Sequence, residues 1–176
     1  MAIDRQKTET VHWHAVFTAS RAEKKVRDRL EELGVECFLP VQTVLRQWTY
    51  RKSRGGGPGI AGVVFVRVGR QEQVKVLQTK GVVAFLRLKG EAGAAVIPDK
   101  QMEDFRFLLD FSEEAVEMTN ENIKAGDLVR VVKGSLRGME GELIRHKGVT
   151  KVLVRIDMLG CAMVNIPASF VEKLNK

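Results

Sequence analysis

The sequence contains very little cysteine, histidine, tyrosine and proline. Among its 176 residues there are two Cys, three His, one Tyr and four Pro. Cys37 and Cys161 lie far apart and no CxxC or Cys/His cluster occurs, so we expect neither zinc nor a disulfide. His12, His14 and His146 are scattered, and no Ser, Cys or carboxylate is spaced to form a triad or dyad with them. We therefore expect no metal site, no cofactor and no enzymatic activity.

Long apolar runs and a nucleotide-binding loop are also missing. No stretch approaches the roughly 18 apolar residues that a membrane span requires, and the first ten residues, MAIDRQKTET, lack the apolar core of a signal peptide. The basic and glycine-rich run 51–59, RKSRGGGPG, lacks the Gly-Lys-Ser/Thr ending of a phosphate-binding loop. We expect a cytoplasmic protein without membrane contact, and we interpret residues 51–59 as a basic hairpin tip.

Charge divides the chain into three parts. Residues 1–110 carry a net charge of +6, residues 111–123 carry −4, and residues 124–176 carry +5, which together give the net +7 of the whole chain. Two basic blocks joined by an acidic connector indicate two domains, at 1–110 and 124–176, each able to face a polyanion. The acidic segment lacks a sustained apolar period, so we expect a linker that lets the second domain act separately. Surplus positive charge that serves solubility alone is the alternative.

The second block opens with a glycine-punctuated hairpin pattern. Gly126-Asp127 forms a turn signal, residues 128–133 are rich in β-branched side chains, and Gly134, Gly138 and Gly141 favour a sharp reversal into a second strand. Further strands are predicted near 139–147, 150–156, 162–167 and 170–174. This pattern predicts a small all-β barrel.

The first block alternates between strands and helices. Residues 12–18 read as a strand, and Ser20 to Glu23 has the form of a capping box that opens a helix over 21–33, ended by Gly34. Further strands are predicted at 35–48, 62–68, 82–88 and 94–97, with helices at 71–79 and from Pro98 onward. The order β-α-β-β-α-β-α predicts an α+β domain, an antiparallel sheet with its helices on one face.

Two resemblances follow from these motifs. The run from Gly126 to Gly141 resembles the KOW motif of NusG-type transcription factors and several ribosomal proteins. The first block resembles the NusG amino-terminal (NGN) domain through Trp13-x-Ala15-Val16, Phe38-Leu39-Pro40, the Val-Phe-Val strand, Gly81-Val82 and Ile97-Pro98-Asp99. Together they cover residues 12 to 174. The resemblance implies a monomeric transcription elongation factor that binds RNA polymerase across its cleft and suppresses pausing or termination.

Some positions depart from the usual NusG pattern. Ala61-Gly62-Val63 stands where Pro-Gly-Tyr is usual, and His14 where Tyr is usual. The run 44–48, with the basic residues after it, looks more like the operon-specific antiterminators of the UpxY and RfaH type, which serve for example surface polysaccharide operons. A housekeeping factor acting with Rho and a ribosome-associated, RNA-binding KOW protein are the alternatives.

The strand at 62–68 is apolar on both faces, which indicates an exposed apolar patch on the sheet. In the NusG family this surface grips the clamp helices of RNA polymerase. The resemblance implies polymerase contact at Phe17, Val63 and Phe65, supported by Trp13. An ordinary core or a dimer contact is the alternative for these residues.

A basic stripe follows the first helix, where Arg21, Lys25 and Arg29 recur every four residues with Lys24 beside them. Such a stripe suits phosphate contact. In RfaH-type factors the start of this helix and a basic residue before the next Gly-Val strand meet non-template DNA, which implies nucleic-acid contact at Arg21, Lys24, Lys25, Arg29 and Lys80. A solvated face with pairs such as Glu23–Arg27 and Arg27–Glu31 is the alternative.

The hairpin loop at 157–160 carries Leu159, which we expect to be exposed at its tip. In the family this loop docks on a small-subunit ribosomal protein or on Rho, and the resemblance implies partner contact through Leu159.

Overall fold

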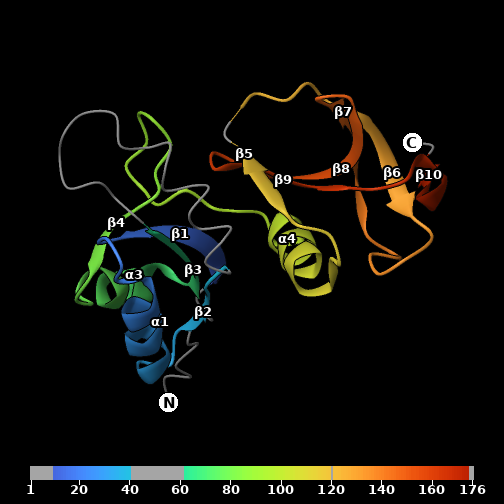
Figure 1. The fold of residues 1–176 in the computed structure, drawn as a ribbon. Helices are drawn as coiled ribbons and strands as arrows, with labels where there is room; N and C mark the ends of the chain where they lie inside the picture. The colour runs from blue at the N-terminus through green and yellow to red at the C-terminus, as the bar shows by residue number, and fades with distance from the viewer. Residues whose placement is uncertain (1–9, 41–61, 120, 175–176) are drawn as a thin grey trace, which may run out of the picture.

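The computed structural model describes residues 10–40, 62–119 and 121–174 (Figure 1). The amino-terminal half contains β1 (His12–Thr18), α1 (Glu23–Glu32), β2 (Glu36–Phe38), β3 (Gly62–Val68), α3 (Arg70–Leu77), β4 (Val82–Phe85) and α4 (Asp99–Phe111). The carboxy-terminal half contains β5 (Glu117–Thr119), β6 (Asp127–Val131), β7 (Glu140–His146), β8 (Val149–Ile156), β9 (Gly160–Asn165), the 3-10 turn η1 (Ala168–Phe170) and β10 (Val171–Lys173). The predicted α+β class is confirmed.

The first sheet has the strand order β2-β3-β1-β4 and is antiparallel throughout its strand pairs. Alternate side chains of β1 and β3 point to opposite faces because a strand repeats every two residues. On one face Val16, Val64 and Val66 pack with Val26 of α1 and Val76 of α3. Helices α1 and α3 therefore cover this face, as the sequence predicts.

The opposite face of the sheet is covered as well, by α4. The buried side chains of α4, Met102, Phe105 and Leu108, pack in one cluster with Ala15 and Phe65 of the sheet. The Phe65 and Phe105 rings meet edge to face with centroids 5.9 Å apart. The expectation that all helices lie on one face was therefore wrong. A strand that is apolar on both faces needs a cover on each, and here the chain supplies both.

The start of α1 differs from the predicted capping box. The helix begins at Glu23 after Ala22, without a side-chain cap, because Arg21 adopts a left-handed φ of 60° and separates Ser20 from the helix. The Glu23 side chain lies instead against Gly62, where a β-carbon would collide with it. Gly34, at φ 76°, ends the helix as predicted.

The second sheet is antiparallel, with the strand order β10-β6-β7-β8-β9-β5. It fits the predicted small β domain. Strand β5 belongs to the segment expected to be a linker: it pairs with β9, and Met118 is buried. The acidic composition of 111–123 did not reveal this strand, because three residues are too short to show a period.

Helix α4 joins the two halves. One apolar cluster runs from Trp13 and Phe65 through Met102 and Leu108 of α4 into the second sheet, where it includes Val152. Figure 1 shows α4 between the two sheets.

Two sequence predictions lie outside the described residues, namely the continuation of the second strand over 41–48 and the basic hairpin tip at 51–59. In the part of the chain that is described, no helix is long and apolar enough to cross a membrane.

Candidate interaction surfaces

The apolar sheet face that was predicted to be exposed is largely buried. Trp13 is 5% exposed, Val63 is 4% exposed and Phe65 is fully buried. The cover is α4, whose Met102, Phe105 and Leu108 complete the core beneath it. The prediction of an open patch at these three positions was wrong, because an apolar strand face does not reveal whether its cover is a partner or a later helix of the same chain.

Phe17 is the exception among the four residues of this face. It is half-buried and packs at the margin of the α4 cluster, opposite Val63 on β3 and Ala84 on β4. At the other end of β1, the guanidinium of Arg106 lies 5.8 Å from the Trp13 ring centre and 5.1 Å from that of Phe38. The sheet face is therefore closed at the Trp13 end and partly accessible at the Phe17 end.

His14 points to the face of the same strand that α1 and α3 cover. Its Nδ1 lies 2.9 Å from the Ala95 carbonyl oxygen, and its ring meets Phe85 edge to face at 5.8 Å. Burial lowers the pKa of His14 below its ordinary value. His14 is therefore a buried residue of the strand. Among the described residues no group of His, Cys, Asp and Glu is placed to hold a metal ion, and both cysteines are free thiols.

The structure brings two of the predicted basic residues, Arg29 and Lys80, into contact. Arg21, Lys24, Lys25 and Lys80 are exposed and Arg29 is half-buried. The Arg29 guanidinium donates a 2.7 Å hydrogen bond to the carbonyl oxygen of Lys80, which brings the turn before β4 against α1. The Ala19 amide donates a 2.8 Å hydrogen bond to the carbonyl oxygen of Gly81, which joins the end of β1 to the same turn. The bond between Arg29 and Lys80 places Lys80 beside α1, although the two residues lie 51 positions apart.

These cations are available to a ligand. Within the described residues no ion pair involves Arg21, Lys24, Lys25 or Lys80. The alternative of a helix face neutralised by i,i+4 pairs is also weakened, because Arg27 pairs with its neighbour Asp28 at 3.0 Å. The start of α1 lacks a side-chain cap, so its first amides add partial positive charge at the same place.

The hairpin tip of the second sheet is arranged differently from the prediction. Leu159 is only 3% exposed and belongs to the cluster that contains α4, whereas Met158, at φ 69°, is the exposed apolar residue. The prediction of an exposed Leu159 was wrong. A turn sequence predicts that a residue lies at a tip, but the tip here packs against another element.

The tip loop is held to α4 by a pair of hydrogen bonds. The Asp157 amide donates to Oε1 of Gln101 at 2.8 Å, and Nε2 of Gln101 donates to Oδ1 of Asp157 at 2.9 Å. Nearby on α4, burial raises the pKa of Asp104 and the charge of Glu140 from β7 adds to the effect, while the Lys100 ammonium, 2.9 Å away, opposes it. Sequence reasoning missed Gln101 and Asp157, since nothing in their spacing signals a contact.

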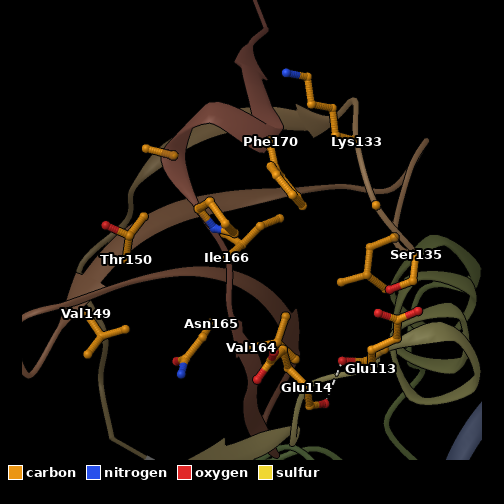
Figure 2. A pocket seen from close by; sticks show the side chains of 15 residues that line it. Glu113, Glu114, Lys133, Ser135, Val149, Thr150, Val164, Asn165, Ile166 and Phe170 are labelled. Carbon is orange, nitrogen blue, oxygen red and sulfur yellow. Dashed lines mark hydrogen bonds between the residues drawn. The ribbon is translucent and has the colours of Figure 1, made fainter.

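A cavity of about 570 Å³ lies at the other end of the second sheet (Figure 2). Its wall combines the segment after α4, at Ser112 to Glu114, with the β6–β7 loop and the end of β9. Sequence reasoning gave no signal of it, because its wall comes from segments far apart in the chain.

Taken together, the described residues define an α+β domain with a basic helix face, joined through α4 to a six-stranded β domain. Comparison with known families agrees: residues 11–106 match the model of the NusG family, described as transcription termination factor nusG. The match spans more than half of the chain, and the protein belongs to the NusG family of transcription factors.

Solved structures with a similar chain course include one described as domain interaction in Thermotoga maritima NusG. It is 23% identical, with a TM-score of 0.47, and the match covers 94% of this chain and 98% of that one. Two conformations of the MjSpt4:Spt5 complex also match, at 18% and 16% identity, TM-scores of 0.31 and 0.28, and coverage of 93% of this chain and 97% and 99% of theirs. No curated protein matches the chain. The family assignment rests on the family model.

Proposed function

We propose that this protein is a non-enzymatic elongation and antitermination factor that binds the clamp helices of RNA polymerase and suppresses pausing at a restricted set of operons. The observation that carries the proposal is the match of residues 11–106 to the NusG family model. Polymerase binding is what the family resemblance implies for this domain. A factor of this kind accelerates elongation by stabilising one state of the polymerase, so its action needs no bond-making residues.

Within the sheet face we assign the direct polymerase contact to Phe17. It is the half-buried member of the four implied residues, whereas Trp13, Val63 and Phe65 are buried and support the strand from beneath. Aromatic side chains are enriched at protein interfaces, and Phe17 is the one of the four that a partner can reach without displacing α4. The family resemblance alone implied contact through Phe17, Val63 and Phe65 together, whereas this assignment keeps only Phe17 as a direct contact.

The basic surface fits a second contact. Four exposed cations that form no ion pair with another described residue, near an uncapped helix start, favour a phosphate backbone over a protein surface. We propose that Arg21, Lys24, Lys25 and Lys80 meet the non-template DNA of the elongation complex. Arg29 positions Lys80 through its carbonyl oxygen.

The carboxy-terminal domain supplies a third contact in this proposal. A small-subunit ribosomal protein or Rho is the partner that the family resemblance implies for the tip loop. Met158 is exposed there and Leu159 is buried under α4, so partner contact through Leu159 requires the loop to leave α4.

The decisive experiment measures binding of purified RNA polymerase to Phe17→Glu. We expect at least tenfold weaker binding, because a charge at an apolar contact is desolvated without a partner. Val83→Glu is the matched control, since Val83 is an exposed apolar residue of the same sheet. Both variants are checked for folding by circular dichroism. Equal binding of Phe17→Glu and Val83→Glu would reject the assigned contact.

Operon specificity is tested separately by mapping chromosome occupancy in cells. Occupancy at a few transcription units supports the specialised role, whereas occupancy at most units identifies a housekeeping factor. Absence of the protein from polymerase and its recovery with ribosomes would support the ribosome-associated alternative.

A further inference from the structure

The cavity at the end of the second sheet has an apolar floor. Val164, Ile166 and Leu136 are at most 7% exposed and belong to the shared core, and Phe170 packs beside them. Val149, which is 42% exposed, forms the outer part of the wall. A concave site with an apolar floor of this size is suited to bind an apolar group.

The shape of the floor depends on a glycine. Gly134 lies in the β6–β7 loop at φ 85°, and a β-carbon there would lie 3.0 Å from the Phe170 ring. The loop can therefore approach the ring closely, and the Phe170 side chain remains in the cavity (Figure 2).

Charges lie on two sides of this floor. Glu113 and Glu114 come from the segment after α4, and Lys133 lies at the end of the cavity away from Glu114, with Ile166 and Phe170 between them (Figure 2). All three are exposed. Among the described residues no ion pair involves any of these three side chains. The two carboxylates on one side of the apolar floor favour an occupant that places a basic group beside Glu113 and Glu114 and an apolar group on the floor.

Two backbone amides at the cavity, those of Val132 and Ile166, already donate hydrogen bonds. The Ile166 amide donates to the carbonyl oxygen of Thr150 at 3.1 Å, and the Val132 amide donates to the carbonyl oxygen of Phe170 at 2.7 Å. These groups are therefore not free to pair with an added strand. The two carboxylates also disfavour a nucleic-acid occupant, since like charges repel.

From this combination we infer that the cavity is a docking site for a short peptide segment of another protein, one that carries an aliphatic side chain next to a lysine or arginine. The aliphatic side chain fills the floor, and the basic side chain pairs with Glu113 and Glu114. This site lies on a different part of the β domain from the tip loop at 157–160, so it adds a contact beyond the proposed function. Failure of either proposal leaves the other intact.

The test is an NMR titration of the 15N-labelled full chain with acetyl-Gly-Leu-Arg-Lys-Gly-amide. We expect amide shifts confined to the cavity wall at 112–114, 133–136, 149–150 and 164–170. Two control peptides replace Leu by Ser or the basic pair by Glu-Glu, and each should bind about tenfold more weakly or not at all. Equal shifts with the acidic peptide, shifts elsewhere, or no shifts at millimolar peptide would overturn the inference.

Two pairs of variants sharpen the result. Glu113→Gln with Glu114→Gln should weaken binding about fivefold and remove its salt dependence. Glu32→Gln with Glu91→Gln makes the same charge change at exposed positions outside the cavity and should leave binding unchanged. Ser135→Trp should block the cavity, whereas Ser169→Trp, at an exposed position that does not line it, should not.

A second copy of the chain is the competing occupant. It would appear as concentration-dependent shifts of the cavity amides without any peptide. That outcome, or unchanged binding in Glu113→Gln with Glu114→Gln, would overturn the inference even if Ser135→Trp altered the fold.

Discussion

Gln101 of α4 and Asp157 of the β8–β9 loop exchange two hydrogen bonds, at 2.8 and 2.9 Å, although they lie 56 positions apart. The pair holds the tip loop against the same helix that covers the first sheet. One helix thus buries both the apolar sheet face and Leu159. In this arrangement α4 contacts both the first sheet and the tip loop.

Replacing Gln101 by alanine should loosen the tip loop. We expect the free energy of unfolding to fall by about 1 kcal/mol, because two partly solvated hydrogen bonds are lost. Hydrogen exchange at the Asp157 amide should accelerate, since that amide loses its acceptor. Glu103→Ala, at an exposed position of the same helix, is the control. Unchanged protection at Asp157 would contradict the role given to this pair.

Phe65→Ala should destabilise the protein by about 3–5 kcal/mol, as truncation of a buried aromatic side chain leaves a cavity. Phe65 is fully buried against Phe105, so Phe65→Asp should unfold the domain and is unsuitable as a test of partner binding. Urea unfolding measures the effect, with Val83→Ala as a control at 52% exposure. A loss below about 1 kcal/mol for Phe65→Ala would mean that α4 does not cover the sheet in solution.

Gly81→Ala should be more destabilising than Gly34→Ala. Both glycines have a positive φ, of 98° and 76°, but a β-carbon at Gly81 would lie 2.8 Å from Cγ2 of Val26, whereas none of the neighbouring atoms comes within 4 Å at Gly34. Backbone strain alone costs about 1 kcal/mol, and we expect a further 1–2 kcal/mol at Gly81 from the collision. Thermal unfolding of the two variants separates strain from collision, and equal effects would show that the turn at Gly81 shifts freely.

Charge reversal at Arg21 and Lys25 together should weaken binding to a paused elongation complex by at least tenfold, and less so binding to free polymerase. The reason is that phosphate contacts release counterions, so their contribution declines as salt rises. Lys75→Glu with Lys89→Glu is the matched control at exposed positions away from the α1 start. Equal losses with both targets, or an unchanged dependence of binding on salt concentration, would show that these cations form an ordinary solvated surface without nucleic-acid contact.

The Glu117–Lys151 pair should make the attachment of β5 pH-dependent. Lys151 is 9% exposed and its Nζ donates to Glu117 at 2.9 Å, which holds the pKa of Glu117 below its ordinary 4.5. Since the folded pKa is the lower one, the stabilisation is present above pH 4.5 and is lost as the pH falls through the folded value. At pH 7 we expect Glu117→Gln to lower the free energy of unfolding by about 1 kcal/mol.

At strongly acidic pH, Glu117→Gln and the unmodified protein should unfold at the same urea concentration. Glu172→Gln is the control, because that carboxylate is exposed and lies 4.0 Å from Arg130. A difference in stability between Glu117→Gln and the unmodified protein that persists at low pH would show that the altered side-chain shape, and not the lost charge, causes it.

Local pattern predicted most of the helices and strands of this protein, although it missed β5. The helix predicted over 21–33 is observed as α1, and Gly34 predicted its end, because a left-handed residue is needed there. The capping box failed for a tertiary reason: Glu23 packs on Gly62, which no local pattern contains.

The surfaces were decided only by the tertiary structure. The sequence by itself determined that β3 is apolar on both faces and that cations recur along α1. It could not determine that α4 covers Phe65, that Arg29 holds the Lys80 turn, or that Leu159 packs under α4. The physical reason is that periodicity specifies which side of an element avoids water, whereas the element that shields that side depends on contacts between segments far apart in the chain.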